Sequence, residues 1–386
     1  MKIKQIYEIM NSVTNEVIGK TDLIQEDLTG LVDLGNEILD ANAVDAYVKS
    51  LVNHIGKVVF VNRAYKGFAP SVLMDAWEFG SVLEKITVDE LPTAVTNETW
   101  SLQDGKSVDP YVFHAPKIST KFYNNKVTFE IEMSFTTRQV KQSFSNATQL
   151  NAFMSMIESS IEKSMTVKLD ALIQRTVNNV IAETIASEYA DKKYNEKSGV
   201  RAVNLLYLYN QTVTTSKKLT PNNAITNPDF IRFATFKLKQ YEKRLGRLTT
   251  LFNVGGKDRF TPSDVLHILM LSDFKDAADV YLQSDTFNKE YTALPNAESV
   301  PYWQGTGNDY AFEKISAINV KNGKTDVNTS GILAIMFDRD CLGVSNLDRR
   351  VTSAYNPKGE FYNNFYKMDA GYFNDLNENA VVFFVA

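Results

Sequence analysis

The clearest pattern in the sequence is helical. Between residues 146 and 188 apolar side chains recur every three or four positions, and neither Gly nor Pro occurs before Gly199. Asn146 and Gln149 have the spacing of a capping box at a helix start. The pattern therefore predicts one helix of about forty residues, roughly 60 Å long at 1.5 Å per residue. Its expected buried face consists of Phe153, Ile157, Ile161, Met165, Leu169 and Leu172.

A helix of this length exceeds the diameter of a small domain, so we expect it to pack against several surfaces along its axis. The alternative is a coiled coil with a second helix. Ser160, Ser164 and Thr176 lie near the apolar stripe, and polar residues at such positions favour the single packed helix.

A second pattern has the period of a β-strand. Residues 127–136 alternate apolar and polar side chains without exception, which predicts a half-buried strand, with residues 111–113 as a possible partner. From residue 63 to 137 Gly and Pro interrupt every helical period, so we predict a long two-stranded excursion. Because an isolated hairpin is marginally stable in water, it is expected to rest on a neighbour. Its expected inter-subunit contacts are Trp77, Phe79, Trp100, Tyr111 and Phe113.

The remaining segments interleave helical and strand patterns, and no flexible linker separates them. The fold class expected from this order is α+β. The first sixty residues are predicted to form short helical pieces, an arm that needs a surface to lie on. The other predicted elements are a strand at 57–62, helices at 228–245 and 273–281, buried strands at 315–320, 331–337 and 380–385, and a loop at 295–309.

Composition narrows the classes of function. The chain has 386 residues, of which 44% are hydrophobic, and a formal net charge of -5 with both signs mixed along its length. A protein that grips nucleic acid needs a surplus of basic residues on one face, so this balance argues against that class. No window reaches the length of a membrane-spanning helix. The single cysteine, Cys341, excludes an internal disulfide and is expected to be buried and inert.

Candidate chemistry is sparse. The three histidines, His54, His114 and His267, stand alone, and no spacing matches a zinc site, a P-loop or a dinucleotide fingerprint. The best candidate is Asp338 with Asp340 after the predicted strand 331–337, because two carboxylates at a strand end can hold a divalent cation. The alternative is a structural strand end whose carboxylates pair with nearby arginines, Arg349 or Arg350. We therefore expect no catalytic residue, cofactor or metal.

The order of these elements resembles the major capsid proteins of tailed bacteriophages, a fold shared with encapsulin compartments. Residues 333–340 (LAIMFDRD), 51–59 (LVNHIGKVV) and 355–362 (YNPKGEFY) are similar to segments of that family, particularly of small podophages. The resemblance implies five parts along the chain. They are an N-terminal arm (1–62), an extended loop (63–138), a peripheral domain with the spine helix (139–221), an axial domain (222–320) and a return to the peripheral domain (321–386).

The resemblance also implies a function. The chain is then a self-assembling subunit of an icosahedral or prolate phage head, made in the host cytoplasm and built into the virion capsid as pentamers and hexamers. A portal and a separate scaffolding protein are the implied partners, and double-stranded DNA is enclosed without sequence-specific binding. Two alternatives stay open: an encapsulin-like shell around a protein cargo, and a metal-dependent transferase using Asp338 and Asp340.

Overall fold

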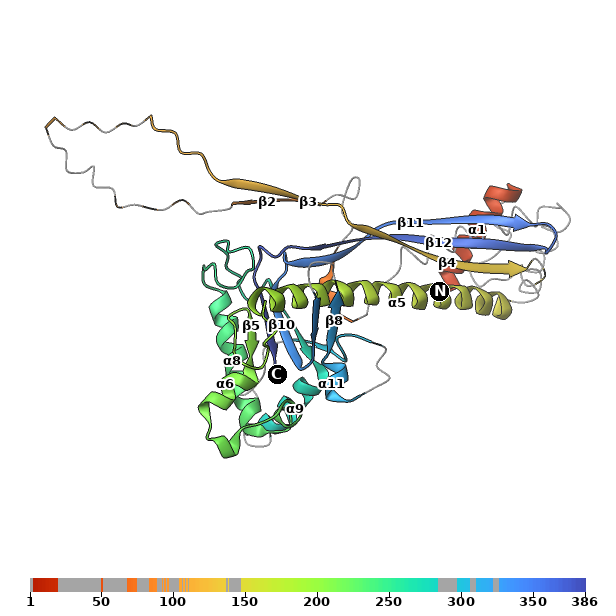
Figure 1. The fold of residues 1–386 in the computed structure, drawn as a ribbon. Coiled ribbons are helices and arrows are strands. Elements are labelled where there is room, and N and C mark those ends of the chain that lie inside the picture. Colours follow the sequence, from red (N-terminus) through yellow and green to blue (C-terminus); the bar gives the residue numbers. More distant parts are fainter. Residues whose placement is uncertain are drawn as a thin grey trace. The chain divides into compact units, whose positions relative to one another are not determined.

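The long helix predicted from the sequence is present in the computed structural model. Helix α5 (Ala147–Glu188) has 42 residues and begins one residue after the predicted cap (Figure 1). The structure describes residues 3–19, 50, 68–74, 83–88, 92, 94, 96, 104–105, 107, 109, 111–136, 138, 147–283, 297–305, 310–321 and 326–386. Asn146, the predicted strand 57–62 and most of the predicted arm lie outside these residues.

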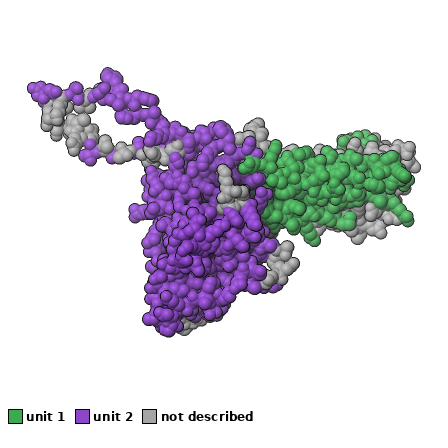
Figure 2. Space-filling view, in the orientation of Figure 1, with its two compact units in different colours: residues 1–81, 125–173, 344–371 green, residues 82–124, 174–343, 372–386 purple. Residues whose placement is uncertain are grey.

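The chain folds into two units, and each is built from three separate segments. Unit 1 comprises residues 1–81, 125–173 and 344–371, and unit 2 comprises residues 82–124, 174–343 and 372–386 (Figure 2). Helix α5 contributes residues 147–173 to unit 1 and residues 174–188 to unit 2. Both units therefore combine segments that are far apart in the sequence.

Unit 1 contains most of a four-stranded sheet of order β1-β11-β12-β4. Its strands are β1 (Leu73–Met74), β11 (Leu342–Asn356), β12 (Phe361–Asn374) and β4 (Lys126–Thr136). Strands β12 and β4 are antiparallel from the pair Phe361↔Thr136 to the pair Gly371↔Lys126. The same unit holds helix α1 (Ile3–Ile18) and the short helix η1 (Pro70–Val72).

The alternation of residues 127–136 is confirmed, but the expected partner is wrong. Strand β4 buries every second side chain more deeply, ending with Phe135 at 2% exposure. It pairs with β12, whereas residues 111–113 form no strand. On the solvent side, Lys367 of β12 forms an ion pair with Glu130 at 2.9 Å. A pairing partner 225 or more positions away along the chain could not be deduced from the local pattern.

The core of unit 1 includes the predicted stripe of α5. Ile157, Ile161 and Met165 are fully buried, and Leu169 and Leu172 are nearly so. The side chain of Phe153 lies outside the described part of the helix. The burial of this stripe is what the period of three to four residues predicts.

Unit 2 is organised around a five-stranded sheet of order β5-β13-β10-β6-β7. All seven residues of the central strand β10 (Ile332–Asp338) are buried, and the strand pairs antiparallel with both neighbours. A strand covered on both faces is continuously apolar, which is why this one could be predicted. The other strands are β5 (Ala202–Asn204), β13 (Ala380–Phe384), β6 (Leu266–Leu271) and β7 (Glu298–Val300).

The two helices predicted in unit 2 lie where the sequence placed them, and the first also starts and ends at the predicted residues. Helix α8 (Pro228–Leu245) has Pro at its first position, and the Asn227 side chain accepts a hydrogen bond from the Phe230 backbone N–H at 3.1 Å. Helix α9 (Ser272–Gln283) covers the helical piece predicted at 273–281. The shorter helices are α6 (Leu205–Thr212), η2 (Thr215–Lys217), α7 (Pro221–Ala224) and α11 (Phe312–Ile315).

Two predictions in this unit need correction. The strand expected at 315–320 starts later, as β8 (Ile318–Lys321), and pairs with β9 (Asp326–Thr329). The segment expected to be a loop, 295–309, contains strand β7, which is parallel to β6. Trp303 follows this strand, fully buried, and its indole N–H donates to the Ile332 carbonyl at 2.8 Å. Three residues of strand are too few to leave a periodic signal.

Candidate functional site: the hairpin β2–β3 and the polar cluster at its base

One of the two-stranded sheets of unit 2 stands apart from the others by the chemistry of its faces. Strand β2 (Leu83–Val88) pairs antiparallel with β3 (Ile118–Tyr123), from Leu83↔Tyr123 to Val88↔Ile118. Along both strands exposed side chains alternate with partly buried ones. The hairpin therefore has two distinct faces, called here the inner face (partly buried) and the outer face (exposed).

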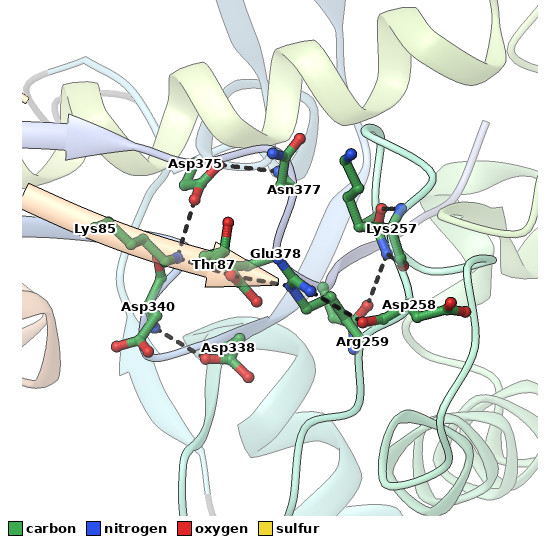
Figure 3. A network of polar contacts seen from close by, with 12 residues as sticks. Lys85, Thr87, Lys257, Asp258, Arg259, Asp338, Asp340, Asp375, Asn377 and Glu378 are labelled. Carbon is green, nitrogen blue, oxygen red and sulfur yellow. Dashed lines mark hydrogen bonds and ion pairs between the residues drawn. The ribbon is translucent and has the colours of Figure 1, made fainter. Parts of the chain in front are cut away.

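The inner face carries charge. The pair Lys85↔Lys121 lies there, and both ammonium groups contact the carboxylate of Asp375. Lys85 Nζ lies 2.9 Å from Asp375 Oδ2 and 2.8 Å from Glu378 Oε1 (Figure 3). Lys121 Nζ lies 2.7 Å from Asp375 Oδ1. Lys85 also donates to the Asp340 carbonyl oxygen at 3.1 Å, so its three donors all have partners.

Arg259 completes this arrangement from another segment of unit 2. Its Nε lies 3.2 Å from Glu378 Oε1, and its guanidinium donates to the Val88 carbonyl oxygen at 3.2 Å. We call the five residues Lys85, Lys121, Arg259, Asp375 and Glu378 the base cluster. Three cations thus surround two carboxylates, and each carboxylate contacts two cations.

Burial makes these contacts stronger than ordinary surface ion pairs. The Asp375 side chain is 1% exposed and that of Glu378 is 10% exposed. Burial alone would raise the pKa of Asp375, but hydrogen bonds from Lys121 and Lys85 outweigh it and lower the pKa to about 2. For Lys85 burial lowers the pKa, and the contacts with Glu378 and Asp375 overcome this and raise it. Both partners are therefore held in their charged forms.

The outer face is mostly apolar and open to solvent, with Glu84 and Thr120 as its two polar side chains. Ile86, Val88, Ile118 and Phe122 are 66%, 43%, 55% and 63% exposed. A hairpin lying on a protein body normally turns its apolar face inward and its polar face to water. In β2–β3 this polarity is reversed. An exposed apolar face of this kind is typical of a surface that another molecule covers.

Two of the five predicted contact residues lie in the described part of the segment that joins β2 to β3. Tyr111 is 90% exposed and Phe113 is 85% exposed. Trp77, Phe79 and Trp100 lie outside the described residues. The base cluster itself was not predicted. Its only local signal is the alternation in residues 83–88 (LEKITV), where Lys85 and Thr87 share a face.

Asp338, one of the two carboxylates considered as a metal site, is held by hydrogen bonds within the protein. Asp338 is buried, and it accepts hydrogen bonds from the Thr261 hydroxyl at 2.7 Å and the Asp340 backbone N–H at 3.0 Å. Its pKa is raised, mainly by burial. Arg350, the expected alternative partner, instead pairs with Asp369 at 2.8 Å. No group of three or more metal-ligating side chains occurs among the residues that the structure describes.

The side chain of the single cysteine is not accessible to solvent. Cys341 is fully buried, and burial raises the pKa of its thiol far above the ordinary value. This agrees with the prediction of an inert thiol. Within the described ranges, no helix combines the length and the apolarity needed to cross a membrane.

Comparison with known proteins assigns the chain to a family. A model of the Phi29-like phage major capsid proteins matches residues 8–384. The chain belongs to this family. It is therefore a major capsid protein that forms the shell of a phage head, a structural and non-enzymatic component of the virion. This finding confirms the resemblance to podophage capsid proteins, selects the phage head over an encapsulin-like compartment and rules out the transferase hypothesis.

Among solved structures, two phage chains are similar to this one. A chain in a structure described as the head fiber and inner core protein gp22 of native bacteriophage P68 is similar with a TM-score of 0.50 and 12% identity, covering 84% of this chain and 86% of that one. A chain of the Staphylococcus phage Andhra capsid gives 0.49 and 10%, with the same coverage. No curated protein matches the sequence. At 12% identity the likeness to the P68 chain bears on the fold alone, and with its TM-score of 0.50 it supports the α+β capsid fold.

Proposed function

We propose that the hairpin β2–β3, with the aromatic residues beyond it, is the arm by which each subunit holds a second copy of the same chain in the shell. The observation that carries this proposal is the reversed polarity of the hairpin. Its charged inner face is satisfied within unit 2, while the outer face presents Ile86, Val88 and Phe122 to solvent.

Energetics favour an occupant for this face. Fully burying one Val, Ile or Phe side chain is worth about 1.5–3 kcal/mol relative to leaving it exposed. The four apolar side chains of the outer face therefore offer several kcal/mol to any complementary surface, even after the losses of association. Tyr111 and Phe113, almost fully exposed, extend this surface. Trp77, Phe79 and Trp100 belong to the same proposed contact set.

The occupant is a second copy because a shell is built from copies of its major capsid protein. Many modest contacts of this size let wrongly placed subunits dissociate and still close a stable shell collectively. Closed symmetry then covers every such surface, which prevents open fibres. In this proposal the copies form pentamers and hexamers, and a portal and a separate scaffolding protein complete the head. The net charge of -5 favours enclosing DNA without gripping it.

We also propose that the chain is divided into the five parts that the resemblance implies. Residues 1–62 act as an arm, 63–138 as the extended loop, 139–221 as the peripheral domain with its spine helix, 222–320 as the axial domain and 321–386 as the return to the peripheral domain. The spine α5 gives a rigid support, because its apolar stripe is fixed in the core of unit 1.

The test is a double substitution on the outer face, Ile86→Ser with Phe122→Ser. Both side chains are mostly exposed in the subunit, so we expect its solubility and unfolding midpoint to stay close to those of the wild type. Electron microscopy of the purified protein should show subunits or small oligomers and few closed shells. Thr120→Ser, on the same face of β3, is the matched control and should assemble normally. Closed shells at wild-type yield from the double variant would overturn the proposal.

A further inference from the structure

The inner face of the hairpin changes in chemical character from one pair of residues to the next along the strands. The layer nearest the body is apolar, with the pair Leu83↔Tyr123 and a Tyr123–Phe373 ring contact at 5.1 Å between centroids. The next layer is the pair Lys85↔Lys121, and the third is Thr87↔Ser119, whose hydroxyl oxygens lie 3.3 Å apart. Only the first layer offers apolar surface to the body of unit 2.

From this layering we infer that β2–β3 is a hinged arm whose direction is set by the base cluster. The apolar root at Leu83 and Tyr123 is the pivot, and the ion pairs of Lys85 and Lys121 are the latch that holds the arm at one angle. The inference deepens the proposed function, because it names what orients the surface that a second copy would cover. Lys85 and Lys121 are positioning residues, since they act through the strands that carry the outer face.

The latch is strong because it is nearly dry. Asp375 and Glu378 are almost fully buried, so salt screens their contacts much less than it screens exposed pairs. Arg259 holds the latch from the other side, by its pair with Glu378 and its hydrogen bond to the Val88 carbonyl. The charged forms of Asp375 and Lys85 also keep the contact ionic.

The same latch can open without a hydrophobic penalty. Swinging the arm about its root separates Lys85 and Lys121 from the carboxylates and exposes Thr87 and Ser119, all of which water can solvate. No large apolar side chain of layers two and three is uncovered, because the apolar residues of those layers face outward. The angle of the arm thus depends on charge, whereas its affinity for a partner depends on the outer face.

The test measures the angle directly in the full-length subunit before assembly. Spin labels are placed on Thr120→Cys, exposed on β3, and on Lys217→Cys, exposed in η2 of the same unit. Cys341 is fully buried and its thiol pKa is raised, so it stays unlabelled. Double electron–electron resonance then reports the distribution of distances between the two labels. The variants carry Lys85→Gln with Lys121→Gln. The control is Lys193→Gln, which removes the exposed pair of Lys193 with Glu196 at 2.8 Å.

We expect one narrow distance distribution for the wild type and for Lys193→Gln, and a broad one for the double lysine variant. Hydrogen exchange of the β10 amides should not change, which shows that the body of unit 2 stays folded. A narrow distribution at the wild-type distance in the double variant would overturn the latch. This outcome is independent of shell formation by the Ile86 and Phe122 variant, so the two proposals can fail separately.

Discussion

Truncating Leu169 to alanine tests whether α5 is the structural support of unit 1. Leu169 lies near the middle of the helix and is 1% exposed. The change removes three carbon groups, worth about 0.8 kcal/mol each, or about 2.4 kcal/mol in transfer free energy. The cavity left behind adds to this, and measured truncations of buried leucines cost about 2–5 kcal/mol. We therefore expect a loss of at least about 2.4 kcal/mol in the free energy of unfolding of unit 1.

Val167 provides a control two residues away on the same helix. Its side chain is 64% exposed, so Val167→Ala removes little buried surface. Alanine also has a higher helix propensity than the β-branched valine, by roughly 0.5 kcal/mol. These two effects nearly cancel, and the expected change in stability is within about 0.5 kcal/mol of zero.

Hydrogen exchange is the suitable assay, because a chain of two units need not unfold in a single step. In Leu169→Ala the most protected amides of residues 157–172 should exchange roughly fiftyfold faster, the equivalent of about 2.4 kcal/mol. Val167→Ala should leave their rates unchanged, and shells should form from Val167→Ala at normal yield. Equal exchange rates in the two variants would refute the assignment of the buried stripe and the supporting role of α5.

Two further predictions concern a glycine and the base cluster. Gly331 has φ +85°, and a Cβ there would lie 1.9 Å from the Val385 carbonyl oxygen, so Gly331→Ala should cost about 3 kcal/mol or more. Gly256→Ala, with φ +64° and open space around it, should cost only about 1 kcal/mol; equal shifts in thermal midpoint would contradict this. The pKa of Asp375 is depressed to about 2 from its usual 3.8, so its carboxylate stabilises the fold above the usual value and loses this effect as pH falls towards 2. The difference in unfolding midpoint between wild type and Asp375→Asn should therefore be equal at pH 7 and pH 5 and shrink by pH 3; its disappearance at pH 5 would argue against the ion pairs.

The elements that could be predicted from sequence are those whose signal is local. Helix α5 has an unbroken stripe, β10 is continuously apolar, and α8 begins at a proline and ends before a glycine. Strand β12 was not predicted, because polar and apolar residues occur on both of its faces. The buried face includes Asn364, whose amide donates to the Met133 carbonyl at 3.3 Å, while the aromatic residue Phe365 lies on the opposite, more exposed face.

The base cluster could not be predicted for a different reason. Lys85, Arg259 and Asp375 are separated by more than a hundred positions each, and single charged residues carry no sign of a partner. Local patterns identified the region around the hairpin as extended and in need of support. Which face lay inward depended on the distant carboxylates. The sequence pattern alone predicted that the aromatic residues contact a neighbour. The contacts of Lys85 and Lys121 with Asp375 show which face of the hairpin is turned towards unit 2 and which is left exposed.

The distribution of the base cluster along the chain also orders events in folding. Unit 2 needs its last segment, residues 372–386, which brings Asp375 and Glu378 to the hairpin and strand β13 to the central sheet. Lys85 and Lys121 lie much earlier in the chain. Their carboxylate partners in the base cluster, Asp375 and Glu378, are available only when that last segment is in place. Contacts so distant in sequence form late, because chain closure costs entropy before they stabilise anything. If the base cluster sets the direction of the hairpin, as inferred above, that direction is fixed only when the sheet of unit 2 is complete, and we expect an incompletely folded subunit to present no oriented outer face to a second copy.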